Sequence, residues 1–349
     1  MTKPLLAACA ALLLAGCFGH RATVSETADI SVSVPAQTEP LTPAATPASS
    51  PQTIAATPAV SSPKTTPAPA ATPAPATPTV LSNKPATPAP DKPVFKDEPL
   101  IDLTDRRLNP LAVLTPAPDT SLVSPWQGEQ LKYGLYYSFV KVGTAYIKNR
   151  GLVDVNGRQA YVIQTSAFSA SVIDSVFKVR DINLSWLDAQ NFYSLGYSQS
   201  LREGRYRRDE WVLFDYDTNT YRGELAKKSG TREISGTLTT PVLDMLTALY
   251  FVRGQDLKNG QDVVFDIINR EEQYPLVVKV IGRETVKTAA GKFKCVIVEP
   301  QFRGEGIFVS KGKSLQVWLT DDPRRLPIKM KVEVFIGSVS AELLEYQRN

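Results

Sequence analysis

The sequence contains a single histidine among its 349 residues, and that residue, His20, lies near the N-terminus. Ser-His-Asp and Cys-His catalysis both need a histidine beside the nucleophile, and histidine is a common ligand of zinc. The chain beyond position 20 can therefore form neither of these catalytic arrangements and no metal site that uses histidine. The dinucleotide-binding motif G-x-G-x-x-G, the P-loop and C-x-x-C are absent as well. We accordingly expect no catalytic residues, no metal site and no cofactor, so the predicted protein is not an enzyme.

Cysteine is scarce too. Two of the three cysteines, Cys9 and Cys17, lie in the first 17 residues, which leaves Cys295 alone in the rest of the chain. No disulfide can form within a domain that has one cysteine. Cys295 alternates with Phe293 and Ile297, so we expect a small buried side chain on the apolar face of a strand. The alternative is a reactive thiol.

The chain lacks a strong excess of either charge. Its 39 basic residues are nearly balanced by 35 acidic residues, which gives a formal net charge of +4. A nucleic-acid-binding domain concentrates basic residues on one face, and the mild, mixed charge argues against such a partner. We therefore expect no nucleic acid among the partners, and the composition gives no indication of the oligomeric state.

The apolar run at residues 5–15 is too short to cross a bilayer, because a membrane-spanning helix needs about 20 residues. With Lys3 before it, the run has the length of a signal-peptide core. It ends at Leu14-Ala15-Gly16-Cys17, which resembles the bacterial lipobox that is cleaved before an acylated cysteine. We expect residues 1–16 to be a lipoprotein signal peptide and residues 17–29 a lipidated N-terminus. The alternative is an ordinary signal peptide with a coincidental cysteine.

Acyl chains on Cys17 are the expected attachment to the membrane, since several chains suffice for stable anchoring. Phe18 follows the cysteine, where an aspartate would be the retention signal for the inner membrane. By resemblance to bacterial lipoprotein sorting, the predicted location is the outer membrane, facing the periplasm, with the inner membrane as the less favoured choice.

Residues 30–100 are rich in proline, alanine and threonine, with units such as Ala71-Thr72-Pro73-Ala74-Pro75. Such a segment has too few large apolar side chains to offset the entropy of ordering, so we expect a disordered linker. Residues 101–125 mix apolar residues with prolines and fit either a strap packed on the next domain or continued linker. Residues 126–349 are the predicted folded domain.

Residues 126–349 alternate apolar and polar side chains with a period of two, which predicts β-strands over most of the domain. Asn156-Gly157 is typical of a two-residue hairpin turn. A second two-residue turn, at Gly337-Ser338, would place Val332 opposite Leu343. About a dozen strands in sequence order predict a large curled antiparallel sheet or an incomplete β-barrel, because open sheets of this size rarely stay flat.

Residues 240–254 have helical spacing instead. Thr240 is the expected N-cap, Pro241 suits the first helical position, and Gly254 suits a left-handed residue after the end. We expect this helix to pack on the concave side of the sheet or to plug its mouth. The predicted fold is therefore mainly β, with one packed α-helix.

Three stretches resemble the bacterial domain-of-unknown-function family 3108: LREGRYRRD at 201–209, LTALYFVR at 246–253 and VWLTDDPRRLPI at 317–328. IGSV at 336–339 adds to the resemblance, which covers about residues 126–347 in the same order. The resemblance implies a β domain of the cell envelope, carried on a lipoprotein or a secreted protein. It implies no established activity and no catalytic residues.

The hairpin near residue 204 carries four arginines that could bind phosphate or carboxylate groups: Arg202, Arg205, Arg207 and Arg208. Glu203, Asp209 and Glu210 lie among them, so a self-neutralised surface hairpin is the simpler interpretation. Asp321-Asp322 could supply paired carboxylates for glycan chemistry, but Asp-Asp-Pro is also typical of a turn, which we favour.

Leu246, Leu249 and Tyr250 could line an apolar cavity, although such a stripe on a helix more often belongs to a filled core. Two functions follow. The first is a non-catalytic module that binds a lipid or another apolar envelope ligand inside the curled sheet. The second is a structural or interaction lipoprotein that reaches a protein or peptidoglycan partner through its linker. An empty cavity with an apolar lining would favour the first, and a filled interior the second.

Overall fold

The computed structural model describes residues 95–101, 108–110, 126–269, 271–301, 315–333 and 337–347. These residues all belong to one of the two compact units of the chain, which comprises residues 1–20 and 76–349. The other unit, Arg21–Pro75, lies outside the described residues, as do Cys17 and the rest of the predicted signal peptide.

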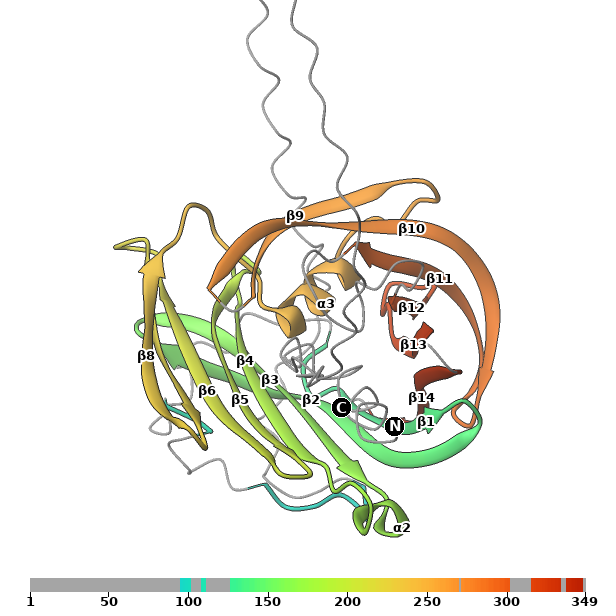
Figure 1. The fold of residues 1–349 in the computed structure, drawn as a ribbon. Coiled ribbons are helices and arrows are strands. Elements are labelled where there is room, and N and C mark those ends of the chain that lie inside the picture. The colour runs from blue at the N-terminus through green and yellow to red at the C-terminus, as the bar shows by residue number, and fades with distance from the viewer. Residues whose placement is uncertain are drawn as a thin grey trace, which may run out of the picture. The chain divides into compact units, whose positions relative to one another are not determined.

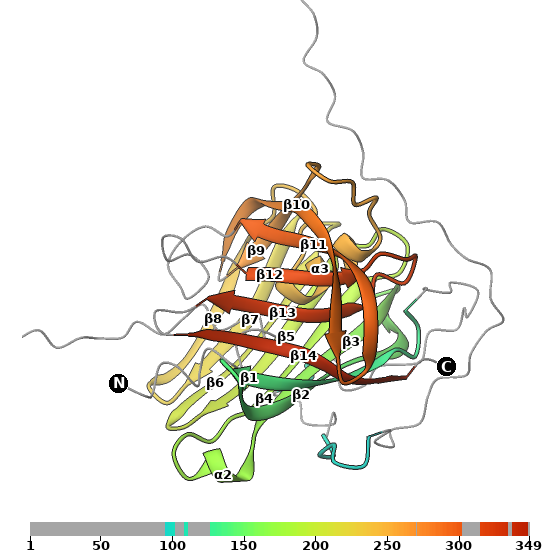
Figure 2. The same ribbon diagram turned by 90° about the vertical axis from the view of Figure 1, so that its right-hand side faces the viewer.

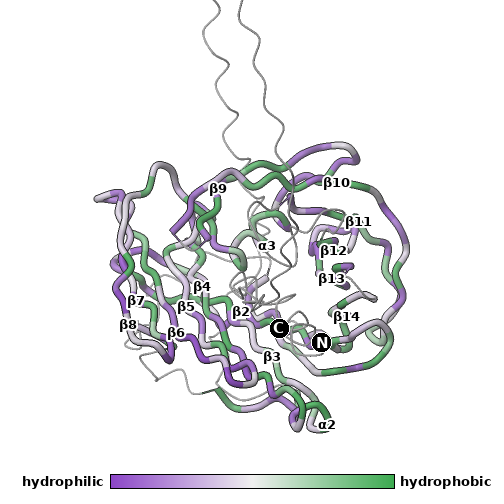
Figure 3. The backbone as a smooth tube through the Cα atoms, in the orientation of Figure 1, coloured by the Kyte–Doolittle hydropathy of each residue, from purple (hydrophilic) through white to green (hydrophobic). Residues whose placement is uncertain are grey.

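Within the described residues, fourteen strands form one antiparallel sheet (Figure 1). The strands are β1 (Gln130–Tyr137), β2 (Val140–Val155), β3 (Arg158–Ser169), β4 (Arg180–Asp188), β5 (Ser194–Glu203), β6 (Tyr206–Asp215), β7 (Thr220–Lys227), β8 (Gly230–Thr237), β9 (Asp262–Asn269), β10 (Glu272–Thr288), β11 (Gly291–Gln301), β12 (Leu315–Thr320), β13 (Pro327–Glu333) and β14 (Ser338–Gln347). Their spatial order is β8-β7-β6-β5-β4-β3-β2-β1-β14-β13-β12-β11-β10-β9. Hydropathy alternates along many of the strands, as the period of two predicts (Figure 3).

The sheet curls without closing. β8 and β9 are its two outer strands and do not pair with each other. The chain between them contains α3 (Met245–Arg253), which lies within the curl (Figure 1). The short helix α2 (Ser171–Asp174) joins β3 to β4. The predicted fold class, a large curled antiparallel sheet with one packed helix, is confirmed.

The helix α3 begins later than the sequence predicts. Its N-cap is Asp244, whose carboxylate accepts hydrogen bonds from the backbone N–H of Leu246 (2.9 Å) and Thr247 (3.1 Å). The Thr247 hydroxyl accepts a hydrogen bond from the Asp244 N–H in return, which completes a capping box. The predicted cap, Thr240, lies before the helix and donates to Asp266 at 2.5 Å. Gly254 is right-handed, with φ −82°, so the predicted left-handed end is wrong.

Asp244 also connects the helix to the sheet. Its buried carboxylate accepts hydrogen bonds from the hydroxyls of Ser185 on β4 (2.8 Å) and Ser194 on β5 (2.7 Å). A buried carboxylate is costly unless its oxygens find donors, and here two backbone N–H groups, two serine hydroxyls and the Thr247 hydroxyl supply them. The start of α3 is therefore set by contacts with distant strands as well as by local capping.

The hairpin of β13 and β14 has a different register from the predicted one. Val332 lies opposite Val339 and Met330 opposite Ala341, whereas the two-residue turn would have placed Val332 opposite Leu343. Four residues, 334–337, connect the strands, and the predicted partners Val334 and Ile336 are outside the described residues. The shift is even, so each side chain keeps its predicted face. The turn at Asn156-Gly157 is confirmed, with Val155 opposite Arg158.

A segment before the domain packs on the outer face of the sheet. Phe95 is buried, with its ring centroid 5.9 Å from that of Tyr146, and Glu98 forms a 2.5 Å ion pair with Lys148. Leu108 is buried in a second cluster with Trp186, and its carbonyl accepts a hydrogen bond from Ser198. Residues 95–100 are predicted to be linker, and a strap packed on the domain is considered only for residues 101–125. In the structure, Phe95 and Glu98 already pack on the sheet.

Candidate functional site

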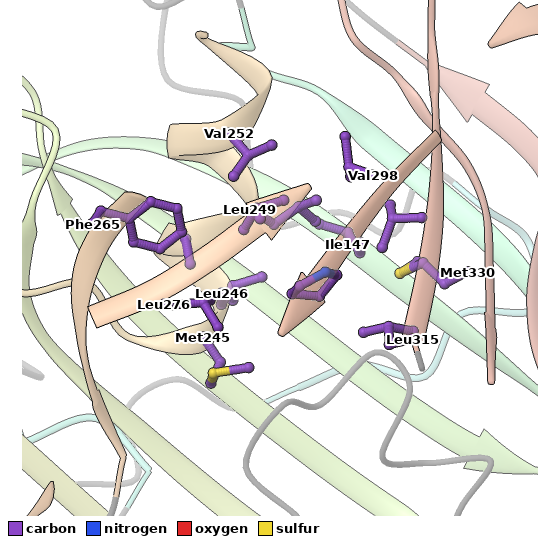
Figure 4. Close-up of a pocket in the computed structure, with 14 residues that line it drawn as sticks. Ile147, Met245, Leu246, Leu249, Val252, Phe265, Leu276, Val298, Leu315 and Met330 are labelled. Atoms are coloured by element: carbon purple, nitrogen blue, oxygen red, sulfur yellow. The ribbon is translucent and has the colours of Figure 1, made fainter. Parts of the chain in front are cut away.

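An apolar pocket lies between α3 and the strands that face it (Figure 4). Its enclosed volume is about 90 Å³, and the whole hollow, including the part open to solvent, is about 680 Å³. The fourteen side chains that line it are all apolar. They are Ile147, Met245, Leu246, Ala248, Leu249, Val252, Phe265, Leu276, Val278, Val298, Pro300, Leu315, Val317 and Met330.

Five of the nine residues of α3 line this pocket, because they recur at helical spacing on one face. The other lining residues come from β2 and from β9 to β13, at alternate positions that point to the inside of the curl. Leu246 and Leu249 remain only partly buried, although they face the interior. Protein interiors are close-packed, so a hollow at this position marks incomplete packing beneath the helix.

Tyr250 does not line the pocket with Leu246 and Leu249. It lies on another face of α3, where its ring packs edge-on against Trp126 with centroids 5.5 Å apart. Burial raises the pKa of its hydroxyl, and the neighbouring Glu129 carboxylate raises it further. Tyr250 is therefore a neutral core residue, and the sequence interpretation that grouped it with the cavity is corrected.

The four arginines of the β5–β6 hairpin do not form one site. Arg202 makes two hydrogen bonds to the Asp209 carboxylate, at 2.7 and 2.9 Å, and Arg208 pairs with Glu210. Arg205 and Arg207 are exposed at and beside the turn. Adjacent strand residues point to opposite faces, so Arg207 and Arg208 diverge. The prediction that the hairpin neutralises its own charges therefore holds for Arg202 and Arg208, two of the four arginines.

Arg208 instead faces a second, polar cavity of about 120 Å³. Its lining contains two ion pairs, Arg208 with Glu210 and Arg232 with Glu271. The Tyr197 hydroxyl donates to Glu210 at 2.8 Å, so this buried carboxylate has two partners. The charges of this cavity are largely balanced by one another.

A buried carboxyl that sequence reasoning missed lies on the same half of the sheet. Burial raises the pKa of Asp181 well above its usual value, and the neighbouring Glu203 carboxylate raises it further. The backbone N–H of Arg202 donates to Asp181 at 2.7 Å, which offsets only part of this effect. The protonated form of Asp181 is therefore favoured more than in an exposed aspartate. An aspartate in a period-two pattern looks like a surface residue, so no local signal indicated its burial.

Asp321 and Asp322 occupy the turn between β12 and β13. Asp321 pairs with Arg325 (2.8 Å) and with Arg283 (2.9 Å), and these arginines hold its pKa below the usual value. Burial would raise the pKa of Asp322, but its interactions with Arg324 and Thr320 together outweigh burial and the pKa is lowered. Neither carboxylate is suited to donate a proton, which agrees with a turn-forming role.

Cys295 is buried beneath the sheet, and burial raises the pKa of its thiol to about 11. It is therefore a poor nucleophile at neutral pH. Among the residues that the structure describes, no group of three or more His, Cys, Asp and Glu side chains is placed to hold a metal ion. No helix in the same residues is long and apolar enough to cross a membrane.

The solved structures that match this chain share little sequence with it. A β-barrel-like protein of domain-of-unknown-function family 1849 from Brucella abortus has a TM-score of 0.43 and 9% identity, covering 63% of this chain and 96% of its own. A protein provisionally described as a lipoprotein from Parabacteroides distasonis has a TM-score of 0.29 and 8% identity, covering 65% and 98%. A hypothetical protein from Chlamydia trachomatis has a TM-score of 0.29 and 8% identity, covering 62% and 87%.

None of the curated proteins compared with the chain matches it. A family model does match, over residues 132–344, and its description is a protein of unknown function, DUF3108. The match covers the sheet from β1 to β14 together with the helix beneath which the apolar pocket lies. The chain therefore belongs to the DUF3108 family of proteins of unknown function.

Proposed function

We propose that this domain is a non-catalytic module that binds a lipid or another apolar ligand of the cell envelope in the pocket beneath α3. The observation that carries the proposal is the lining, in which all fourteen side chains are apolar. Such a lining offers water few hydrogen-bond partners, so an apolar group displaces water from it favourably. An acyl chain gains about 0.8 kcal/mol for each methylene group that it buries there.

The size of the pocket limits how the ligand is held. An engineered apolar cavity of about 150 Å³ accepts a benzene molecule, and the enclosed part here is about 90 Å³. It accommodates the end of an acyl chain. The rest of the ligand lies in the part of the hollow that is open to solvent.

The proposal also places the protein at the outer membrane, facing the periplasm and held by acyl chains on Cys17. Its support is the sequence around the cysteine, Leu14-Ala15-Gly16-Cys17, and the absence of aspartate at position 18. The Pro-, Ala- and Thr-rich segment would then act as a tether, whose mean reach as a flexible coil is about 50 Å. That reach brings the domain to lipids of the membrane in which it is anchored.

A second candidate is a structural or interaction lipoprotein that binds a protein or peptidoglycan partner. The observation in its favour is the small enclosed volume of about 90 Å³, which is also within the range of a packing defect. The two candidates differ in one respect that can be measured, because only the first requires the pocket to be filled by a ligand.

The direct test is binding of a fluorescent fatty acid to the purified protein. We expect saturable binding, and we expect Leu249→Trp to weaken it at least tenfold because the indole fills the hollow. The matched control is Leu100→Trp, the same change at a side chain that is 79% exposed. Circular dichroism and melting temperature check that both variants fold, and Leu246→Trp repeats the test from a second lining position.

The result that would overturn the proposal is the absence of saturable binding, or binding that Leu249→Trp and Leu246→Trp leave unchanged. Mass spectrometry of lipids that co-purify with the protein from membranes identifies the ligand class. If the protein carries no lipid and binds no fatty acid, the structural or interaction lipoprotein is the candidate that stands.

A further inference from the structure

In the half of the sheet from β1 to β8, the antiparallel order of the strands collects four connections at one end. They are the β1–β2 turn, the β3–β4 connection with α2, the β5–β6 turn and the β7–β8 turn. Backbone contacts show that they are neighbours. The Ala170 N–H donates to the Val142 carbonyl (2.9 Å), the Gly204 N–H donates to the Lys178 carbonyl (2.8 Å), and Arg208 lies opposite Lys227. We call this set of connections the basic end.

The basic end exposes large apolar side chains at its tips. Phe139 is 90% exposed in the β1–β2 turn, and Val140 beside it is also exposed. In the next connection, Val172 is 77% and Val176 64% exposed, on either side of the end of α2. Figure 2 shows α2 projecting beyond the sheet. Four of the eight large hydrophobic side chains that are exposed in the described residues thus lie in two adjacent connections.

Basic side chains lie in the same two connections as these apolar tips and in the next two. Six exposed lysines and arginines belong to the four connections or to the strand residues beside them: Lys141, Lys178, Arg205, Arg207, Lys227 and Lys228. The acidic residues of the same connections, all of which the structure describes, are less accessible. Asp174 is partly buried and pairs with Arg180, and Glu203 is buried. The exposed charge of these four connections is therefore positive.

The opposite end of the same strands has the reverse charge. The turns that join β2 to β3 and β6 to β7 carry Asp154, Asp215 and Asp217, with Arg158 as the basic residue among them, whereas Asp188 beside the β4–β5 turn is buried. The nearly neutral composition of the chain conceals this separation. The half of the sheet from β1 to β8 thus presents one positive and one negative end.

We propose that the basic end docks on the surface of a membrane that contains anionic phospholipids. Apolar side chains at loop tips enter the interface between headgroups and acyl chains, while lysines and arginines of the basic end contact the phosphates. The charge complementarity selects a negatively charged surface, and the isolated tips favour a lipid interface over a soluble polyanion. This contact belongs to the folded domain, so it is independent of any acyl group on Cys17 and of occupancy of the pocket.

The test uses the full chain with Cys17→Ser, so that no acyl group on that residue contributes, and measures co-sedimentation with vesicles. Vesicles of phosphatidylglycerol and phosphatidylethanolamine are compared with vesicles of phosphatidylcholine alone. We expect binding to the anionic vesicles that weakens as salt is added, because each basic side chain near such a surface strengthens binding about fivefold.

Matched pairs of variants locate the contact. Arg205→Ser with Lys228→Ser removes two exposed charges at the basic end, and we expect about 25-fold weaker binding. Lys287→Ser with Lys292→Ser removes two exposed charges beside the β10–β11 turn, giving the same net charge, and should change binding by less than about threefold. Val176→Ser should weaken binding, whereas Val264→Ser, at a side chain that is 58% exposed on β9, should not.

Three results would overturn the proposal. The first is equal weakening by the two charge pairs, which would indicate attraction by net charge alone. The second is no effect of Val176→Ser, or equal binding to phosphatidylcholine vesicles. The third is binding to duplex DNA as strong as to anionic vesicles, which would make the basic end a general polyanion site. Loss of fatty-acid binding by Leu249→Trp without loss of vesicle binding separates this contact from the pocket.

Discussion

Arg253, the last residue of α3, forms a double ion pair with Glu129, which lies immediately before β1, at 2.7 and 2.6 Å. The two residues are 2% and 4% exposed. Burial alone would lower the pKa of Arg253, but the Glu129 carboxylate outweighs it and the pKa is raised. The guanidinium also lies 5.0 Å from the ring of Trp126 and 4.8 Å from that of Tyr250. The pair therefore connects the end of the helix to the first strand.

The first prediction concerns this ion pair. Glu129→Ala should destabilise the domain by about 3–5 kcal/mol, because it leaves a buried arginine without a counter-charge. Chemical denaturation followed by circular dichroism measures the change. Glu224→Ala, at an exposed glutamate, is the control and should change stability by less than about 0.5 kcal/mol. Equal effects of the two substitutions would contradict the role given to the pair.

The second prediction concerns Asp181, whose pKa is raised in the folded state above the ordinary value of 3.8. At a pH between the pKa of the unfolded state and the higher pKa of the folded state, Asp181 keeps a proton in the folded protein that it has released in the unfolded chain. Stability is then fully present below the unfolded pKa and falls as pH rises toward the folded pKa, by up to about 1.4 kcal/mol per pH unit.

Asp181→Asn should remove this dependence, so the variant gains stability over the wild type as pH rises from about 4 toward neutrality. Urea denaturation at several pH values gives the difference. Asp262→Asn makes the same change at an exposed residue and serves as the control. A difference between wild type and Asp181→Asn that is independent of pH would show that Asp181 is ionised in the folded protein.

The third prediction concerns packing beneath α3. Truncation of a well-packed core leucine costs about 2–5 kcal/mol, and we expect Leu343→Ala, at a fully buried residue, to fall in this range. Leu249→Ala should cost less, because Leu249 already borders an empty pocket. Adding fatty acid should raise the melting temperature of the wild type through mass action. A full penalty at Leu249 with no shift from ligand would indicate a filled core.

The fourth prediction concerns the segment on the outer face. Residues 126–349 should still unfold cooperatively, but with a melting temperature about 5–15 °C below that of residues 95–349, since the buried Phe95 and Leu108 are lost. Residues 95–349 should melt at nearly the same temperature as the full chain. Equal melting temperatures for the two shorter chains would show that the outer segment contributes no stability.

The fifth prediction concerns anchoring. Cys17→Ser should abolish incorporation of a labelled fatty acid into the protein in cells, because the thiol and the new N-terminus are the expected acylation sites. Cys9→Ser, a serine substitution at the cysteine inside the predicted signal peptide, should leave labelling intact. Labelling of the Cys17→Ser variant would contradict the lipobox interpretation.

Strand positions could be predicted from the sequence because side chains alternate in a half-buried sheet and turn residues have distinct backbone preferences. Asn156 and Gly157 both adopt positive φ, 52° and 79°, as a tight hairpin requires. The β13–β14 register could not be predicted in the same way. Turns of two and four residues differ by an even shift, so both keep Val332 on the inner face and the hydrophobic pattern does not distinguish them.

The site was predictable only in part. Helical spacing grouped Leu246 with Leu249, but their partners on β9 to β13 come together only in the curled sheet. The start of α3 was missed because Thr240-Pro241 and Asp244 are both plausible N-termini locally, and the hydroxyls of two distant strands favour the second. The charge separation between the ends of the sheet was hidden in a balanced composition, because it depends on which turns fall together.

β8 and β9 do not pair with each other, which leaves a seam in the curled sheet, the wall around α3. In a closed barrel, a full ladder of backbone hydrogen bonds would join these two strands. Here the segment before α3 lies at the seam and makes only a few backbone hydrogen bonds. Leu243 exchanges two with β9, to Asp266 (2.9 Å) and from Ile268 (3.0 Å), and Val242 accepts one from Ser194 (2.9 Å). Side chains add to this link, through the Arg232–Glu271 ion pair and the hydrogen bonds of Thr240 with Asp266 and Gln273. Within the described residues, the seam still has only three backbone hydrogen bonds, where eight paired positions join β9 to β10. Under the proposed function, this seam is therefore where a chain-like ligand would break the fewest backbone hydrogen bonds on entering through the wall.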